Sequence, residues 1–169
     1  MKNIVLIGMP GVGKTTVGEL IAAKEGLLFK DTDREIERLT GKPIPLIIYQ
    51  QGIEYFRNFE EEVIQQIASE SGDCVIATGG GSVLRTVNVI RLKENGVLFN
   101  LIRVPDIKDF SGRPPCRSKH DWIRLEHERR LVYLESADYS IHGTSAEQTA
   151  NIIISIMKGE KNNALQHQN

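Results

Sequence analysis

The chain lacks an excess of charge of either sign and any long apolar run, and these absences narrow what it can do. Its 169 residues include 21 Lys or Arg and 22 Asp or Glu, so the formal net charge at pH 7 is −1. Such a balance leaves no broad positive field for nucleic acid or an anionic lipid surface. No apolar run approaches the length of a membrane span, and the chain opens directly into a strand pattern without a visible secretory signal. We expect neither a nucleic acid nor a membrane partner.

Cysteine is also scarce. Cys74 and Cys116 lie far apart and form neither a disulfide framework nor a zinc spacing, and the four histidines show no ligand spacing. We therefore expect a cytoplasmic protein in a reducing compartment. The length and the 40% hydrophobic content suit one domain. We place this domain at residues 1–158, followed by a polar tail at 159–169 that should be flexible.

Short β-branched apolar runs alternate with segments of helical periodicity. This alternation is typical of βα units around a parallel sheet. Strands are expected at 4–7, 27–30, 74–77, 97–102 and 139–141, and helices at 14–25, 32–40, 54–69, 87–93, 121–137 and 146–157. Thr32 and Glu35 have the spacing of a capping box that would start the helix at 32–40. Residues 105–119 are expected to form a mobile loop, and 41–52 is irregular or a short helix.

One motif is present in full. Residues 8–15 have the sequence GMPGVGKT, which matches G-x-x-x-x-G-K-[ST] and follows the strand expected at 4–7. Its glycines allow backbone N–H groups to turn inward around a phosphate, and the next helix directs its positive end to the same place. Lys14 can then reach the β- and γ-phosphates, and the Thr15 hydroxyl can coordinate Mg²⁺. This motif predicts nucleotide binding.

Two carboxylates, Asp31 and Asp33, follow the second expected strand. Ligands of open α/β sheets bind at this edge of the sheet. One carboxylate could hold a metal-bound water, and the other could accept a proton from a phosphoryl acceptor. The alternative is that one or both cap the next helix. Three glycines, Gly79 to Gly81, close the strand at 74–77 and suit close approach of a ligand to the main chain, although a plain tight turn also explains them.

Three arginines could bind anions. Arg57 has Glu60 three residues later on a predicted helix, so it is either rigidly held for bidentate binding or part of a surface ion pair. Arg129 falls in an apolar stripe with Trp122, where a guanidinium needs an anionic partner or a water-filled cleft. A second apolar stripe on that segment leaves its burial open. Arg113 lies in the proline-containing loop and is either a closing residue over a phosphate or an idle surface residue.

Taken in chain order, these motifs resemble those of the shikimate kinases. The likeness runs from Met1 to about Met157 and depends most on DTD at 31–33, FRNFE at 56–60 and ATGGG at 77–81. The resemblance implies the nucleoside monophosphate kinase-like P-loop NTPase fold, a three-layer α/β/α arrangement with a five-stranded parallel sheet. It also implies ATP- and Mg²⁺-dependent phosphorylation of the shikimate 3-hydroxyl, a step toward aromatic amino acids, by a monomer.

The resemblance further implies a role for each motif residue. The nucleotide phosphates and Mg²⁺ would be held by Gly11, Val12, Gly13, Lys14, Thr15, Thr16 and, through water, Asp31. Shikimate would be held by Asp33, Arg57, Gly79, Gly80, Gly81 and Arg129, with Glu60 steadying Arg57. Asp33 would orient or deprotonate the reacting hydroxyl, and Arg113 would close onto the transferring phosphate from a lid at about 105–120. The segment 101–113 is a few residues shorter than is usual in the family, which predicts weak or altered nucleotide affinity.

Two alternatives remain beside this interpretation. One is a kinase of the same fold that acts on another hydroxylated acid such as gluconate. The other is a nucleotide or shikimate sensor with little catalysis. The presence of Lys14, Asp31 and Asp33 favours an enzyme, because a sensor has no need of a base.

Overall fold

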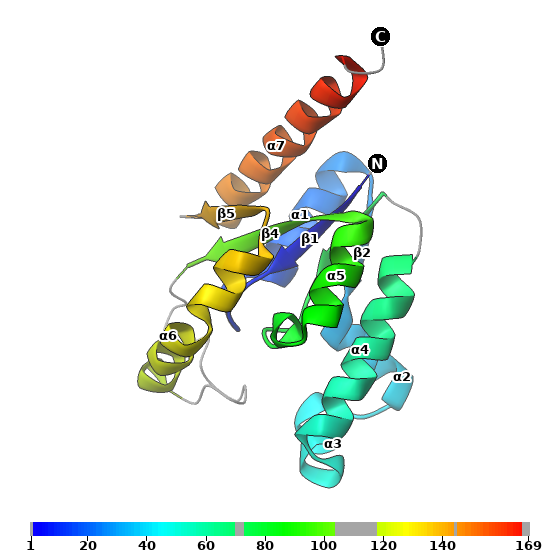
Figure 1. The fold of residues 1–169 in the computed structure, drawn as a ribbon, viewed down its shortest axis with the longest axis vertical. Coiled ribbons are helices and arrows are strands. Elements are labelled where there is room, and N and C mark those ends of the chain that lie inside the picture. The colour runs from blue at the N-terminus through cyan, green and yellow to red at the C-terminus, as the bar shows by residue number, and fades with distance from the viewer. Residues whose placement is uncertain (1, 70–72, 104–117, 144, 167–169) are drawn as a thin grey trace.

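A five-stranded parallel sheet forms the centre of the protein (Figure 1). The computed structural model describes residues 2–69, 73–103, 118–143 and 145–166, with side chains described up to residue 159. The strands are β1 (Asn3–Ile7), β2 (Leu28–Asp31), β3 (Cys74–Ala77), β4 (Gly96–Ile102) and β5 (Tyr139–His142). Their order in the sheet is β2-β3-β1-β4-β5, and every pairing is parallel. The predicted α/β class with a five-stranded parallel sheet is confirmed.

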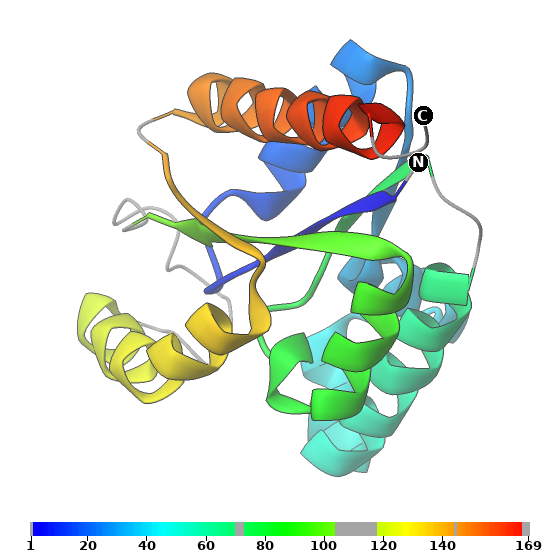
Figure 2. The same ribbon diagram turned by 45° about the horizontal axis from the view of Figure 1, so that its top comes forward.

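Helices cover both faces of this sheet (Figure 2). One face carries α1 (Lys14–Glu25) and α7 (Ala146–Gln166), which pack on each other. The other face carries α4 (Ile53–Ser69), α5 (Thr86–Glu94) and α6 (Lys119–Ser136). The short helices α2 (Thr32–Thr40) and α3 (Ile44–Gln51) pack against α4, and a 3₁₀ turn η1 (Ser82–Leu84) precedes α5. The three layers follow from strands that are apolar on both sides and need cover on both.

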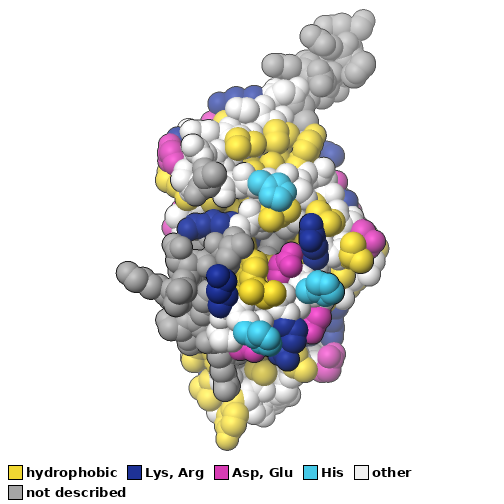
Figure 3. Space-filling view, turned by 90° about the vertical axis from the view of Figure 1, so that its left-hand side faces the viewer, with side chains coloured by type: hydrophobic (Ala, Val, Ile, Leu, Met, Phe, Trp, Pro, Cys, Tyr) yellow, Lys and Arg dark blue, Asp and Glu magenta, His cyan; other side chains and the backbone are white. Residues whose placement is uncertain are grey.

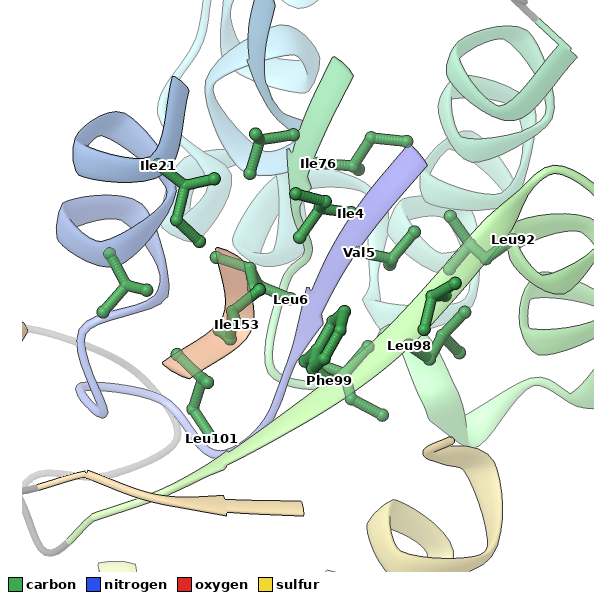
Figure 4. Packing of buried hydrophobic residues seen from close by; sticks show 14 of the residues in the cluster. Ile4, Val5, Leu6, Ile21, Ile76, Leu92, Leu98, Phe99, Leu101 and Ile153 are labelled. Atoms are coloured by element: carbon green, nitrogen blue, oxygen red, sulfur yellow. The ribbon is translucent and has the colours of Figure 1, made fainter. Parts of the chain in front are cut away.

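The core lies on the two faces of the central strands. Successive strand residues point to opposite faces, so Leu6 packs toward Gly18 of α1 while Val5 lies on the side of Leu92 (Figure 4). Residues 4–7 of β1 are at most 2% exposed. The edge strand β2 is partly exposed, with Leu28 at 69%. A sheet anchored this firmly at its centre holds the loops that leave its carboxyl edge in fixed positions.

The strand register brings three of these loops together. Ala77 at the end of β3 pairs with both Leu6 of β1 and Asp31 of β2. The P-loop at 8–13, the start of α2 and the glycine loop at 78–81 therefore leave the sheet side by side. This arrangement is the one that parallel strands impose on the turns following their carboxyl ends.

Two predicted features at helix ends are wrong, although α2 has its predicted bounds of 32–40. The N-cap of α2 is Asp31, whose carboxylate accepts hydrogen bonds from the backbone N–H groups of Asp33 and Arg34. Thr32 is instead fully buried, and Glu35 pairs with Arg38, so the predicted capping box does not form. Asp caps helices as well as Thr does, and here its position at the strand end decides the start.

The other corrected end is that of α7. This helix continues to Gln166, well beyond the predicted end at residue 157. It therefore enters the segment for which the sequence predicts a flexible tail, and the flexibility itself stays a prediction. The segment at 41–52, which had no firm assignment, contains α3. Residues 105–117 of the predicted mobile loop lie outside the described residues, whereas Ser118 and Lys119 are the N-cap and the first residue of α6.

Candidate active site

The P-loop has the backbone conformation that its sequence predicts. Gly8, Gly11 and Gly13 all have positive φ, of 137°, 82° and 94°, which L-residues with a side chain rarely adopt. Space is also limiting, because a Cβ on Gly8 would lie 2.7 Å from the Leu101 carbonyl oxygen. Gly13 is the N-cap of α1 and offers no side-chain oxygen to the first N–H groups of the helix. The start of α1 is therefore available to an anion.

The first two side chains of α1 bond to the P-loop and to Asp31. Lys14 is buried, and its Nζ donates to the carbonyl oxygens of Gly8 (2.8 Å) and Met9 (2.9 Å). Thr15 Oγ1 donates to Asp31 Oδ2 at 2.8 Å. Asp31 thus caps α2 with one oxygen and meets the P-loop with the other, so the capping and metal-site interpretations are compatible.

The Thr15 and Asp31 pair fits a nucleotide-bound magnesium ion. Both supply oxygen ligands, and Mg²⁺ is usually held by one or two carboxylates together with phosphate oxygens and waters. No group of three or more His, Cys, Asp or Glu side chains able to hold a metal occurs in the described part of the chain. The two-residue donor set therefore suits a metal that arrives with phosphates better than a metal held by protein alone.

Asp33 lies against the glycine loop. A Cβ on Gly79 would lie 2.6 Å from Asp33 Oδ1 and 2.9 Å from Glu60 Oε1, so only glycine fits between these carboxylates. Burial, followed by the negative charges of Asp31 and Glu60, raises the pKa of Asp33 from 3.8 to about 6, against the lowering effect of Lys14 and Arg57. Asp33 therefore has cations on both its nucleotide side and its α4 side.

Arg57 is held rigidly and does not form an exposed ion pair. Its Nη1 donates to Glu60 Oε2 at 2.5 Å, and the side chains are 15% and 0% exposed. The guanidinium carbon lies 5.1 Å from the centre of the Phe56 ring. A Cβ on Gly81 would collide with Arg57 Nη2, so the guanidinium rests directly on the glycine loop. Its orientation is fixed from several sides, as bidentate anion binding requires.

Arg129 reaches the glycine loop from α6. Its Nη1 donates to the Gly80 carbonyl oxygen at 3.2 Å, and the Tyr133 hydroxyl donates to the same oxygen. The stripe of Trp122 faces the protein, whereas the competing stripe with Leu131 is exposed, at 68% for that residue. The choice between the two stripes, which the sequence left open, is thereby settled for α6.

The P-loop and the glycine loop touch directly. A Cβ on Gly80 would lie 2.7 Å from Pro10 Cγ, so the glycine loop packs on the P-loop. Trp122 Nε1 donates to the Pro10 carbonyl oxygen at 3.0 Å and ties α6 to the same point. The predicted residues at 33, 57, 60, 79–81 and 129 therefore share one region beside the P-loop. Arg113 lies outside the described residues, and its contact with a phosphate stays a prediction.

Three residues of this region were not identified from the sequence. Thr32 Oγ1 accepts from the Gly79 N–H at 3.0 Å, and Ser82 Oγ donates to Glu60 Oε1 at 2.8 Å. Tyr133 is the third. The spacing of Arg129 and Tyr133, i and i+4 on one helix, could have indicated a shared face, but no local pattern marks Thr32 or Ser82.

A hollow lies beside the P-loop, and none of residues 78–81 of the glycine loop lines it. It is lined by Val12, Gly13, Thr16, Arg103, Gly143 and Ser145, among others. A Cβ on Gly13 would lie 4.0 Å from Arg103 Nη1, so this guanidinium closes one side of the hollow. Arg103 was not identified from the sequence.

Comparison with known proteins agrees with this geometry. A family model described as shikimate kinase matches residues 10–158. The shikimate kinase of Thermodesulfovibrio yellowstonii is 41% identical over 163 residues, 91% of this chain and 94% of the relative. That of Pelotomaculum thermopropionicum is 47% identical over 168 residues, 94% of this chain and 96% of the relative. The structure of shikimate kinase from Acinetobacter baumannii in complex with shikimate has a TM-score of 0.85 at 32% identity and covers 95% of both chains. The chain therefore belongs to the shikimate kinase family.

Proposed function

We propose that the protein transfers the γ-phosphoryl group of ATP to the 3-hydroxyl of shikimate, giving shikimate 3-phosphate and ADP on the route to aromatic amino acids. The observation that carries this proposal is the meeting of Asp33, Arg57 and Arg129 at the glycine loop, which itself packs on the P-loop. The Asp33 carboxylate can accept a proton, and the two guanidinium groups can bind a carboxylate, beside a loop that binds phosphates. This combination fits a small hydroxylated acid as the phosphoryl acceptor.

On the nucleotide side, the backbone N–H groups of residues 11–16 would surround the phosphates. Lys14 would exchange its bonds to the loop carbonyls for bonds to the β- and γ-phosphates. Thr15 and Asp31 would hold Mg²⁺, Asp31 through water. When bound, Mg²⁺ supplies positive charge to the phosphate oxygens.

On the acceptor side, Arg57 and Arg129 would bind the shikimate carboxylate, and Glu60 would keep Arg57 in position. Gly79, Gly80 and Gly81 would line the pocket with their backbone, and a side chain at any of them would displace Asp33, Pro10 or Arg57. With the carboxylate fixed at one end, the hydroxyls at the other end of the ring would meet Asp33. Such fixed geometry is the main requirement of phosphoryl transfer.

Asp33 would accept the proton of the attacking hydroxyl. Its pKa of about 6 leaves it mostly ionised at neutral pH yet close enough to that pH to act as a base. The hydroxyl oxygen forms a bond to the γ-phosphorus as the bond to the β-phosphate oxygen breaks. ADP leaves with the electron pair of that bond, and Lys14 lies where it can stabilise the developing charge.

The test is an ADP-release assay with Mg·ATP and shikimate, run beside gluconate at equal concentration. We expect turnover with shikimate and at most trace turnover with gluconate. Arg57→Ala and Arg129→Ala should each lose most of the shikimate activity. Preference for gluconate would contradict the acceptor, and shikimate binding without any product would indicate a sensor.

We also propose that the protein is a cytoplasmic monomer that acts on a small-molecule substrate. No helix among the described residues is long and apolar enough to cross a bilayer. On the face that carries α6 and β5, Lys and Arg side chains are interspersed with acidic and histidine side chains (Figure 3). Together with the net charge of −1, this supports a soluble enzyme of small substrates. Sedimentation of the purified protein, which gives its mass in solution, tests whether it is a monomer.

A further inference from the structure

The carboxylate of Glu60 is held by two different donors. It is 0% exposed, and its Oε2 accepts from Arg57 Nη1 at 2.5 Å while Oε1 accepts from Ser82 Oγ at 2.8 Å. Ser82 is also 0% exposed. A buried carboxylate oxygen that loses its donor carries a large desolvation cost. The Ser82 hydroxyl therefore helps to keep Glu60 in the orientation that Arg57 uses.

Ser82 is in turn held through its backbone. Its N–H donates to the Gly79 carbonyl oxygen at 3.1 Å, and its own carbonyl oxygen accepts from Asn88 Nδ2 at 2.9 Å. Asn88 is fully buried, and its Oδ1 accepts no hydrogen bond from the described residues. A buried amide satisfied at only one end is a poor contributor to stability. The bond that it does make fixes the position of Ser82.

We propose that Ser82 is a positioning residue for the acceptor carboxylate, acting on Arg57 through Glu60. This inference rests on the proposed function, in which Arg57 binds the carboxylate of shikimate. Ser82 follows Gly81 directly, so one turn supplies both the backbone on which the Arg57 guanidinium rests and the hydroxyl that fixes its partner. Arg57 is thus held between an anchored carboxylate and a rigid turn.

Removal of the Ser82 hydroxyl should leave the fold intact. The two backbone bonds of residue 82 do not involve its side chain, so the turn of η1 persists in Ser82→Ala. Glu60 then has an oxygen without its donor and can rotate, and the guanidinium follows it. Because bidentate binding depends on a fixed fork, binding of the substrate carboxylate weakens. The nucleotide side contacts neither Ser82 nor Glu60 in the described hydrogen bonds and is unchanged.

The experiment compares wild type with Ser82→Ala, and with Ser136→Ala as the control for loss of a buried serine hydroxyl elsewhere. Titration calorimetry measures binding of shikimate and of its methyl ester, in which the carboxylate charge is masked, and steady-state kinetics give both KM values and kcat. We expect Ser82→Ala to weaken shikimate binding and raise its KM about tenfold. Binding of the ester, KM for ATP and all constants of Ser136→Ala should change less than twofold.

A double-mutant cycle shows whether Ser82 acts through Arg57. In an Arg57→Ala background, Ser82→Ala should weaken shikimate binding less than twofold. An equal loss in both backgrounds, an equal loss of ester binding, or unchanged shikimate binding in Ser82→Ala overturns the inference. Wild-type protein that does not phosphorylate shikimate contradicts the proposed function instead. In that case the same double-mutant cycle, measured as the free energy of unfolding in urea, still tests whether Ser82 is coupled to Arg57. Independent effects of the two substitutions on that free energy overturn the link between them.

Discussion

The nucleotide side and the acceptor side of this site are built in opposite ways. The nucleotide side is mostly one continuous segment, residues 8–16, joined by Asp31 from the end of β2, and would act largely through backbone groups in a conformation set by glycines. The acceptor side is drawn from α2, α4, the glycine loop and α6, and acts through charged side chains. The first is preformed by local sequence, whereas the second exists only when four separate elements pack together.

The two sides also differ in electrostatic cost. Glu60 is fully buried and Asp33 is crowded by two other carboxylates, so the acceptor side confines negative charge away from water. Such an arrangement is unfavourable for folding and useful for binding, as is common at functional sites. Substitutions on the acceptor side should therefore change shikimate binding and the free energy of unfolding, while ATP binding is retained.

The largest expected effect is on turnover. Asp33→Asn should lower kcat roughly 10³-fold, because the base for the acceptor hydroxyl is lost. ATP binding, measured by calorimetry with ADP or a non-hydrolysable analogue, should change little. Comparable loss of nucleotide affinity would show that the roles of Asp31 and Asp33 are reversed.

The same substitution should stabilise the protein at neutral pH. The pKa of Asp33 rises from 3.8 to about 6 on folding. The protonated form is thus favoured in the folded state, and its stabilising contribution is lost as pH rises through about 6. Asn is always neutral, so the free energy of unfolding of Asp33→Asn should exceed that of wild type by up to about 3 kcal/mol at pH 8 and by little near pH 4. Urea unfolding at both pH values checks this, and a difference independent of pH would contradict the crowded environment of Asp33.

Arg57→Ala should raise the KM for shikimate about 30- to 100-fold, because a charge-assisted, buried contact is removed. KM for ATP should stay within about twofold. Arg91→Ala is the matched control, since this arginine has a similar exposure, 25% against 15%, and pairs with Glu61 away from the glycine loop. A similar shikimate defect in the control would indicate that the whole helix pair, and not Arg57, determines binding.

The smallest effect is expected from the glycine loop. Gly81→Ala places a methyl group against the Arg57 guanidinium, so the arginine must shift and shikimate KM should rise about tenfold. Gly159→Ala, whose Cβ would meet nothing within 4 Å, should leave both KM values unchanged. A larger loss of ATP binding than of shikimate binding would place the effect on the P-loop, through the contact of Gly80 with Pro10.

Much of the fold was predictable because its signals are local. The strands at 74–77 and the helix at 14–25 match their predicted bounds, since each has its own apolar pattern and flanking glycines. The bounds of α2 were predicted too, but the capping box of Thr32 and Glu35 was wrong, because both Asp31 and Thr32 can cap a helix and only the tertiary position decides between them. Thr32 is needed elsewhere, as the acceptor for the Gly79 N–H.

The predicted family is confirmed by the comparisons, and it rests on short motifs whose spacing is readable in the chain. The residues that hold the motif side chains in position could not be predicted from the sequence. Ser82 meets Glu60 across a long sequence separation, and nothing in its neighbours signals it. Tyr133 meets Gly80 in the same way, and only its spacing from Arg129 gives a hint. The roles assigned to individual site residues stay predictions until the variants above are measured.

The sequence by itself determined the phosphate cradle and the alternation of strands and helices, because glycine conformation and apolar periodicity act over a few neighbouring residues. Only the tertiary structure decided which arginines contact the glycine loop, which carboxylates crowd Asp33 and which hydroxyl holds Glu60. These contacts join elements that are far apart in the sequence. The free energy of a buried charge depends on every group around it and not on its place in the chain.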